Sequence, residues 1–197
     1  MTEIQPTIGR KKIDKNEAWK NALKSWNSPS IPYVIAPETY EEISRLGPVG
    51  SILERELAFM EFPEFQTYMN LDKIVSTFQE DPQRGLKAIA KHEVGHRFCP
   101  FDVITSIILQ YRAEKGLKGK ELPYDIKRAS RLMLDLNSDM IINTNSARKG
   151  AEDIAWAYQT LSVSKSDSKL WRVYAKSMEL AWKKQILSDD AKLDEKE

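Results

Sequence analysis

The spacing of apolar residues along the chain predicts a mainly helical protein with a small β element. Near the N-terminus, apolar residues recur at i, i+4 and i+7, as on one buried face of a helix: Trp19, Leu23 and Trp26. Asp14 and Glu17, just before them, have the spacing of a capping box. We therefore expect a first amphipathic helix that begins after Asp14 and ends in the Asn-Ser-Pro-Ser segment 27–30.

Between residues 31 and 78 the pattern predicts short elements. The segment 31–36 is β-prone but contains a proline, which favours a short edge strand. A short helix is expected over 38–46, which Gly and Pro follow, and another over 51–61, which opens on a Ser-x-x-Glu capping pattern. The apolar residues of 62–78 fit a helix and a strand equally well, so both remain open for that segment.

A helix with clear start and stop signals is expected over residues 81–98. Asp81 can cap its N-terminus, and Pro82 suits the first helical position. Pro100 ends the helix, because proline disfavours helical geometry in the residue before it. A further helix that begins at Asp102 is apolar nearly all round and is therefore expected in the core.

The C-terminal half predicts three more helices, over residues 124–145, 151–161 and 167–187. The last ten residues, 188–197, are charged and are expected to be frayed. Together these elements predict an α+β, predominantly helical fold. A chain of this length suits a single domain, which we place over 1–187 with its core in about 50–162.

The composition excludes several functional classes. The chain has 197 residues, a formal net charge of +1, one cysteine and 41% hydrophobic residues. The balanced charge argues against nucleic acid as a partner, and the apolar content suits a packed core. The longest apolar stretch, around 103–109, is far shorter than the ~18 residues of a membrane span, and no signal-peptide pattern is present. A single cysteine fits a reducing compartment. We therefore expect a cytoplasmic protein that binds no membrane, and its oligomeric state remains open.

Both histidines of the chain fall in one pentapeptide, His92-Glu93-Val94-Gly95-His96, inside the helix predicted over 81–98. Residues four apart lie on one helix face, so His92 and His96 can present their imidazoles to one metal ion. Glu93 lies about 100° further round, where its carboxylate can reach a metal-bound water. This pattern predicts a Zn²⁺ site with Glu93 as general base. Gly95 is unfavourable in a helix, which indicates close packing there by a substrate strand or a tight core.

A zinc site of this kind needs a third protein ligand, and the chain has no further histidine. Asp139 is the favoured candidate, because it lies beside an apolar helix stripe, where a carboxylate is costly unless it is paired or coordinated. Glu152 and its neighbour Asp153 remain alternatives, although acidic residues favour the first turn of any helix. Cys99 is less suited, because zinc–thiolate sites usually use cysteines in sets.

With the later segment Asn137-Ser-Asp139-Met-Ile-Ile-Asn143, the His-Glu-Val-Gly-His helix resembles the zincin metallopeptidases. It is most similar to small archaeal and bacterial zinc peptidases with an aspartate as third ligand. The resemblance covers roughly residues 81–145. It implies that His92, His96 and Asp139 bind zinc and that Glu93 is the general base. The third-ligand motifs of gluzincins, aspzincins and metzincins are absent from the sequence.

The resemblance implies a zinc-dependent peptidase that hydrolyses peptide bonds by a metal-bound water activated by Glu93, with a peptide or protein as substrate. The alternative is a catalytically inactive, zincin-like module for interaction or regulation. Zincins also pair an extended substrate with an edge strand, which residues 65–69 or 33–36 would supply. Because no further histidine is present, a tyrosine or an arginine would have to stabilise the oxyanion, and the candidate tyrosines are Tyr111, Tyr124 and Tyr158.

Overall fold

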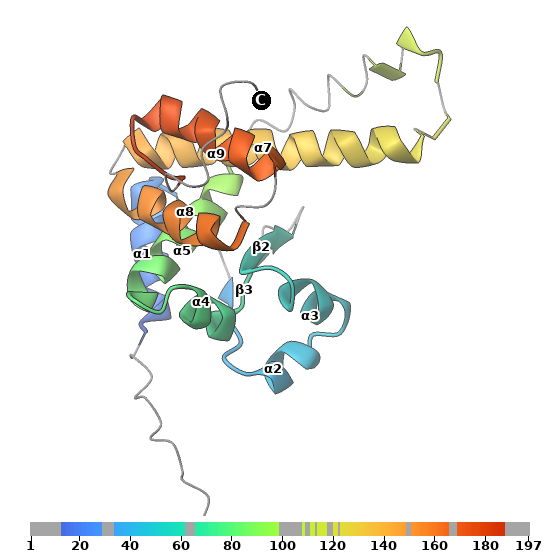
Figure 1. Cartoon of the computed structure of the whole chain (residues 1–197). Helices are drawn as coiled ribbons and strands as arrows, with labels where there is room; N and C mark the ends of the chain where they lie inside the picture. Colours follow the sequence, from blue (N-terminus) through green and yellow to red (C-terminus); the bar gives the residue numbers. More distant parts are fainter. Residues whose placement is uncertain are drawn as a thin grey trace, which may run out of the picture.

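The computed structural model describes residues 13–28, 34–61, 66–98, 108, 111–112, 114–117, 120–121, 123–148, 151–165 and 169–187. Its elements in chain order are α1 (Lys15–Ser25), β1 (Val34–Ile35), α2 (Tyr40–Ser44), α3 (Pro48–Leu53), β2 (Ala58–Glu61), β3 (Gln66–Met69), α4 (Leu71–Thr77), α5 (Pro82–His96), α7 (Tyr124–Arg148), α8 (Ala151–Lys165) and α9 (Lys169–Trp182). The protein is mainly helical with one small sheet, as predicted for an α+β fold (Figure 1). Cys99, most of the apolar helix predicted from Asp102, and the charged tail 188–197 lie outside the described residues.

The capping signals predicted at Asp14 and Asp81 are confirmed. Asp14 caps α1, and its Oδ1 accepts a hydrogen bond of 2.9 Å from the N–H of Glu17. Asp81 caps α5 in the same way, through a 3.0 Å bond from the N–H of Arg84, and Pro82 occupies the first turn. Local chemistry thus places the start of α5, the helix that carries both histidines.

The sheet has the strand order β1-β3-β2, with β1 parallel and β2 antiparallel to β3. β1 is therefore an edge strand, as predicted for 31–36. The ambiguous segment 62–78 contains both kinds of element, since β3 is followed by α4, which the side chain of Asn70 caps. Phe59 of β2 stacks on its cross-strand partner Tyr68 of β3, with ring centroids 5.0 Å apart, which contributes to the pairing.

The helix predicted over 51–61 is wrong for most of its length. The helix in this region, α3, begins earlier, at Pro48, and ends at Leu53. Residues 58–61 form β2 instead. Pairing with β3 partly buries Ala58, Phe59 and Met60 on a sheet, and this tertiary contact outweighs the local capping pattern that predicts a helix.

The helix predicted over 167–187 is too long at its C-terminal end. α9 ends at Trp182, and Lys183 adopts a left-handed backbone with φ 55°. The chain then turns back, so that the carboxylate of Glu179 accepts hydrogen bonds of 2.8 Å from the N–H groups of both Ile186 and Leu187. Ile186 and Leu187 are buried in the core beside α9 rather than carried on the helix.

α5 lies at the centre of the fold and packs against α1, α4, α7, α8 and β2. One hydrophobic core joins buried residues of α1, β3, α4, α5 and α8. A second core joins α8 and α9 with partly buried residues of α7, which runs alongside α9 in Figure 1. Because α5 belongs to the first core and α7 to the second, side chains at the α5–α7 contact lie between the two cores.

Gly95 lies at this contact, where a side chain has no room. A Cβ at this position would collide with Cγ2 of Ile142 on α7 and would lie 2.7 Å from Cζ2 of Trp26. The ring of Trp26 is held there by a 2.8 Å hydrogen bond from its Nε1 to the carbonyl of Lys91 and by stacking on Phe98. Of the two explanations that the sequence left open for Gly95, the tight core is the one observed.

Gly95→Ala is therefore expected to destabilise the fold by about 1–3 kcal/mol, the usual effect of overpacking. At an exposed helix position the same change would stabilise it by about 1 kcal/mol. Urea unfolding of the metal-free chain, followed by circular dichroism, measures the difference. Because Ile142→Ala removes one of the two colliding groups, the double variant should cost less than the sum of the single changes. Equal or higher stability of Gly95→Ala would contradict the packing described.

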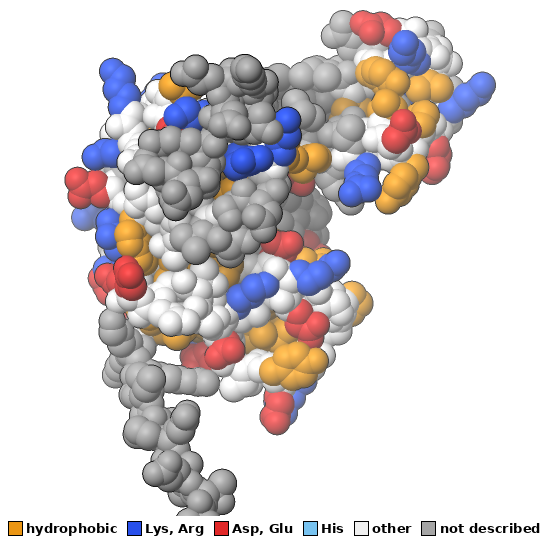
Figure 2. Space-filling model, viewed as in Figure 1, with side chains coloured by type: hydrophobic (Ala, Val, Ile, Leu, Met, Phe, Trp, Pro, Cys, Tyr) orange, Lys and Arg blue, Asp and Glu red, His pale blue; other side chains and the backbone are white. Residues whose placement is uncertain are grey.

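Acidic and basic side chains are interspersed on the face of the molecule shown in Figure 2, in keeping with the formal net charge of +1. Among the helices that the structure describes, none combines the length and the apolar character needed to cross a membrane.

Candidate metal centre

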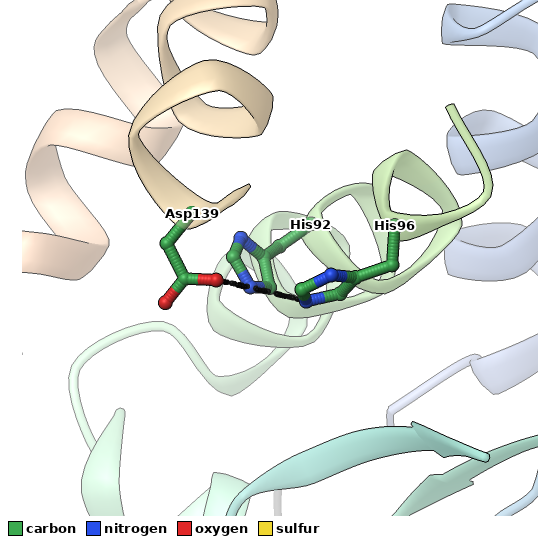
Figure 3. Close-up of side chains that lie close together, drawn as sticks. All are labelled: His92, His96 and Asp139. Carbon is green, nitrogen blue, oxygen red and sulfur yellow. Dashed lines mark hydrogen bonds and ion pairs between the residues drawn. The ribbon is translucent and has the colours of Figure 1, made fainter. Parts of the chain in front are cut away.

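Three potential metal ligands converge between α5 and α7. His92 and His96 lie one turn apart on α5, and Asp139 of α7 faces them (Figure 3). Asp139 Oδ1 is 3.4 Å from His92 Nε2 and 3.7 Å from His96 Nε2, and the two ring nitrogens are 3.2 Å apart. All three ligand atoms lie within 4.8 Å of one another, so the group could hold a metal ion. The structure thus brings together both histidines and the third residue that the sequence favours.

The three side chains are buried to different degrees. The side chains of His92 and His96 are 14% and 19% exposed, and that of Asp139 is 30% exposed. The group is therefore largely enclosed but not sealed from solvent. A catalytic zinc site needs this combination, because one coordination position must remain open to water or substrate.

Asn143 fixes the orientation of the His92 ring from one helical turn beyond Asp139. Its Oδ1 lies 2.9 Å from His92 Nδ1. Because a carbonyl oxygen only accepts hydrogen bonds, Nδ1 carries the hydrogen. In the neutral ring, Nε2 is then the nitrogen with a free lone pair, and it faces His96 and Asp139. This is the tautomer that a metal ligated at Nε2 requires.

The charges of the group separate the pKa values of its two histidines. Burial lowers the pKa of His92, but the charge of Asp139 and the hydrogen bond to it, with smaller contributions from Glu93 and Asn143, raise the pKa to about 9. Burial and repulsion by the His92 cation lower the pKa of His96 to about 4, against the attraction of Asp139. Between these two pH values the imidazole pair holds one dissociable proton.

Glu93 is a buried carboxylate with no ion pair to another of the described residues. It is 4% exposed, and its Oε2 has no hydrogen-bond partner among the described residues. Burial raises its pKa to about 7, opposed by the His92 cation and reinforced by Asp139 and Glu56. Such a group is costly to bury, and perturbed carboxylates of this kind cluster at functional sites.

The alternative acidic ligands make other contacts. Asp153 Oδ1 accepts a 2.7 Å hydrogen bond from Arg84 Nε, and the backbone carbonyl of Glu152 accepts one of 3.1 Å from Arg84 Nη2. Arg84 lies in the first turn of α5, about 12 Å along the helix axis from His92. Within the described part of the chain, neither acidic residue belongs to the group formed with the histidines.

The tyrosines considered for oxyanion stabilisation lie apart from one another. Tyr158 of α8 is buried, and its hydroxyl accepts a hydrogen bond from Nδ2 of Asn143, at the end of the amide opposite to His92. Tyr124, the first residue of α7, is 80% exposed and lies about 22 Å along the helix from Asp139. Tyr111 lies in a stretch where only scattered residues are described. The sequence pattern assigned no role to Asn143, although its spacing of four residues from Asp139 could have indicated one.

The expectation that residues 65–69 supply an edge strand beside the site is wrong. β3 is the central strand, paired with β1 on one side and with β2 on the other. β1, which covers Val34–Ile35 of the second candidate segment, is an edge strand. β2 is the other edge and packs against α5. Among the described residues β2 is paired on one side only, and the strand packs against the helix that carries the histidines.

No protein-family model, curated protein or solved structure matches the chain. What the structure adds to the sequence motifs is the group of His92, His96 and Asp139, which could hold a metal ion. The fold itself is described as α+β and mainly helical.

Proposed function

We propose that the protein is a zinc-dependent peptidase. The observation that carries the proposal is the convergence of His92, His96 and Asp139, with the buried Glu93 carboxylate adjacent to His92 on α5. Two imidazoles and one carboxylate form a donor set of catalytic zinc sites, in which a fourth position stays open. The orphaned Oε2 of Glu93 also fits such a site, because a water in the open position would give it a partner.

His92, His96 and Asp139 would hold the ion in this proposal. Bound Zn²⁺ lowers the pKa of a water ligand to ~7 and polarises the carbonyl group of a substrate. Glu93 transfers protons: it accepts one from the attacking water and returns it to the leaving amine.

A peptide is the substrate class of this proposal, and the sheet supports it. The free edge of β2 offers backbone N–H and C=O groups to an extended chain, which could add to the sheet as a further strand. Because β2 packs against α5, a peptide on this edge would lie along the helix of the metal ligands.

The direct test is hydrolysis of a peptide library by the zinc-loaded chain, with new N-termini identified by mass spectrometry. We expect cleavage that disappears when a chelator removes the metal and returns when zinc is restored. If the chain binds zinc but cleaves no peptide of the library, the peptidase proposal fails, and the non-catalytic metal-binding module is favoured instead.

Zinc affinity is expected to rise with pH between about 7 and 9. Well below its pKa of about 9, His92 is protonated in the metal-free chain and must release the Nε2 proton to bind the ion. Near pH 7 one proton is thus released per ion and the dissociation constant should fall about tenfold per pH unit, and both effects should diminish as the pH approaches 9. Titration calorimetry in buffers of different ionisation enthalpy counts the released protons. A dissociation constant that does not change over this range would contradict ligation by His92 Nε2.

A further inference from the structure

The amide of Asn143 connects the metal-binding group to the two C-terminal helices. Asn143 is 0% exposed. Its Oδ1 faces His92 Nδ1, while its Nδ2 donates to the hydroxyl of Tyr158 on α8 and, at 3.5 Å, to the hydroxyl of Tyr174 on α9. All hydrogen-bonding groups of this buried side chain are therefore directed to α5, α8 and α9.

With Oδ1 toward His92, every hydrogen-bonding group of the Asn143 amide has a partner. An asparagine amide has two N–H donors, and two hydroxyl oxygens lie at the Nδ2 end to receive them. Without these hydroxyls, the donors would be buried and unsatisfied whenever Oδ1 faces His92, which is energetically unfavourable. If the amide were rotated by 180°, its N–H group would face His92 Nδ1. The neutral ring would then carry its hydrogen on Nε2, and this nitrogen could not bind a metal ion.

The two hydroxyls are held by a packed aromatic cluster. The ring of Tyr158 stacks on Trp171 with centroids 5.6 Å apart and meets Trp182 edge-on at 5.9 Å. Tyr174 packs against Tyr158 and Trp171, with centroids 6.3 and 5.7 Å away. Since close-packed rings hold one rotamer, the hydroxyl of Tyr158 is fixed in position before any ion binds.

We propose that Tyr158, and to a smaller extent Tyr174, are positioning residues for the metal centre: they hold the Asn143 amide with its oxygen toward His92, so that Nε2 is available to the ion. The inference rests on the proposed metal site, but its first part concerns the ring orientation of the metal-free chain. The C-terminal helices then serve the metal site as well as the second hydrophobic core.

The first experiment needs no metal. Labelling with ¹⁵N-histidine gives two rings to assign, and the Nδ1–H of His92 should give a slowly exchanging proton signal in the metal-free wild type. We expect Asn143→Leu to lose this protection and Asn143→Asp to keep it, because a carboxylate still accepts from Nδ1–H. Tyr158→Phe should lose most of the protection, and Tyr174→Phe should lose less, because its contact with Asn143 is the longer one.

The second experiment measures zinc affinity. Removal of an outer-shell partner of a metal-ligating histidine typically lowers metal affinity about 10–100-fold. Tyr158→Phe should therefore bind zinc about 10-fold more weakly than the wild type. The matched control is Tyr68→Phe, which makes the same chemical change in the sheet and removes a part-buried 3.2 Å hydrogen bond to Glu61 Oε2 without touching Asn143 or the aromatic cluster. It should lower thermal stability but leave the zinc affinity unchanged.

The outcomes separate the two proposals. If Asn143→Leu keeps the protected Nδ1–H signal, or if Tyr158→Phe matches the wild type in both measurements, the positioning role is overturned. If Tyr158→Phe and Tyr68→Phe weaken zinc binding equally, Tyr158 acts only through general stability, and the positioning role is again overturned. If the wild type shows the protected signal but binds no zinc, the metal site fails while the hydrogen-bonded unit of His92, Asn143 and Tyr158 stands. Should Tyr158→Phe not fold, the Asn143 pair and Tyr174→Phe decide the question.

Discussion

Glu93→Gln is expected to bind Zn²⁺ about as tightly as the wild-type chain and to lose peptide hydrolysis by about 10²–10⁴-fold, the usual contribution of a general base. The substitution keeps the size of the side chain and removes its ability to accept a proton. Glu93 Oε2 makes no hydrogen bond among the described residues, so glutamine breaks no hydrogen bond of that atom. The loss should therefore appear in kcat rather than in folding or in metal content.

The measurement pairs peptide hydrolysis with zinc content by elemental analysis, on the same preparation. Glu152→Gln is the matched control, because it makes the same chemical change at an exposed position in the first turn of α8. Full activity of Glu93→Gln on peptides that the wild type cleaves would exclude Glu93 as the base. A variant without zinc would show instead that Glu93 supports the metal site itself.

The second large effect is expected from Asp139→Ala, which should retain little or no zinc after exhaustive dialysis while the wild type keeps about one ion per chain. Asp139 is the only carboxylate grouped with the two histidines in the described part of the chain. Its removal leaves two protein ligands. We therefore expect the zinc affinity to fall by more than ~100-fold, the largest effect usual for the loss of an outer-shell partner.

Asp135→Ala is the matched control for this change. Asp135 lies one turn earlier on α7 and is exposed, and it is not part of the group with His92 and His96. Its removal should leave the zinc content near one per chain. If Asp139→Ala kept its zinc, the third ligand would have to come from another residue, and the geometry at the α5–α7 contact would lose its proposed role.

The parts of the site that are close in sequence could be predicted from the sequence. Asp81 and Pro82 set the start of α5 through local backbone chemistry, and the spacing of four then puts His92 and His96 on one face. Asp139 could be selected because a carboxylate beside an apolar stripe needs a partner, although choosing it over Glu152 required knowing which helices pack together.

The remaining parts depend on contacts between distant segments. β2 forms because β3 pairs with it, and nothing within residues 51–61 signals that partner. The left-handed Lys183 that ends α9 is stabilised by Glu179 only after the chain has turned back. The link from His92 through Asn143 to Tyr158 likewise joins three helices, and no pattern within one helix predicts it.

The separation of the ligands between α5 and α7 has a thermodynamic consequence. An ion held by His92, His96 and Asp139 would bridge two helices that belong to different cores, and so would close a long loop of chain much as a covalent cross-link does. The ligand set exists only while the two cores are packed together, so the unfolded chain would bind the ion poorly. Folding and zinc binding would then form one linked equilibrium, and the free energy of unfolding would rise with the concentration of free zinc.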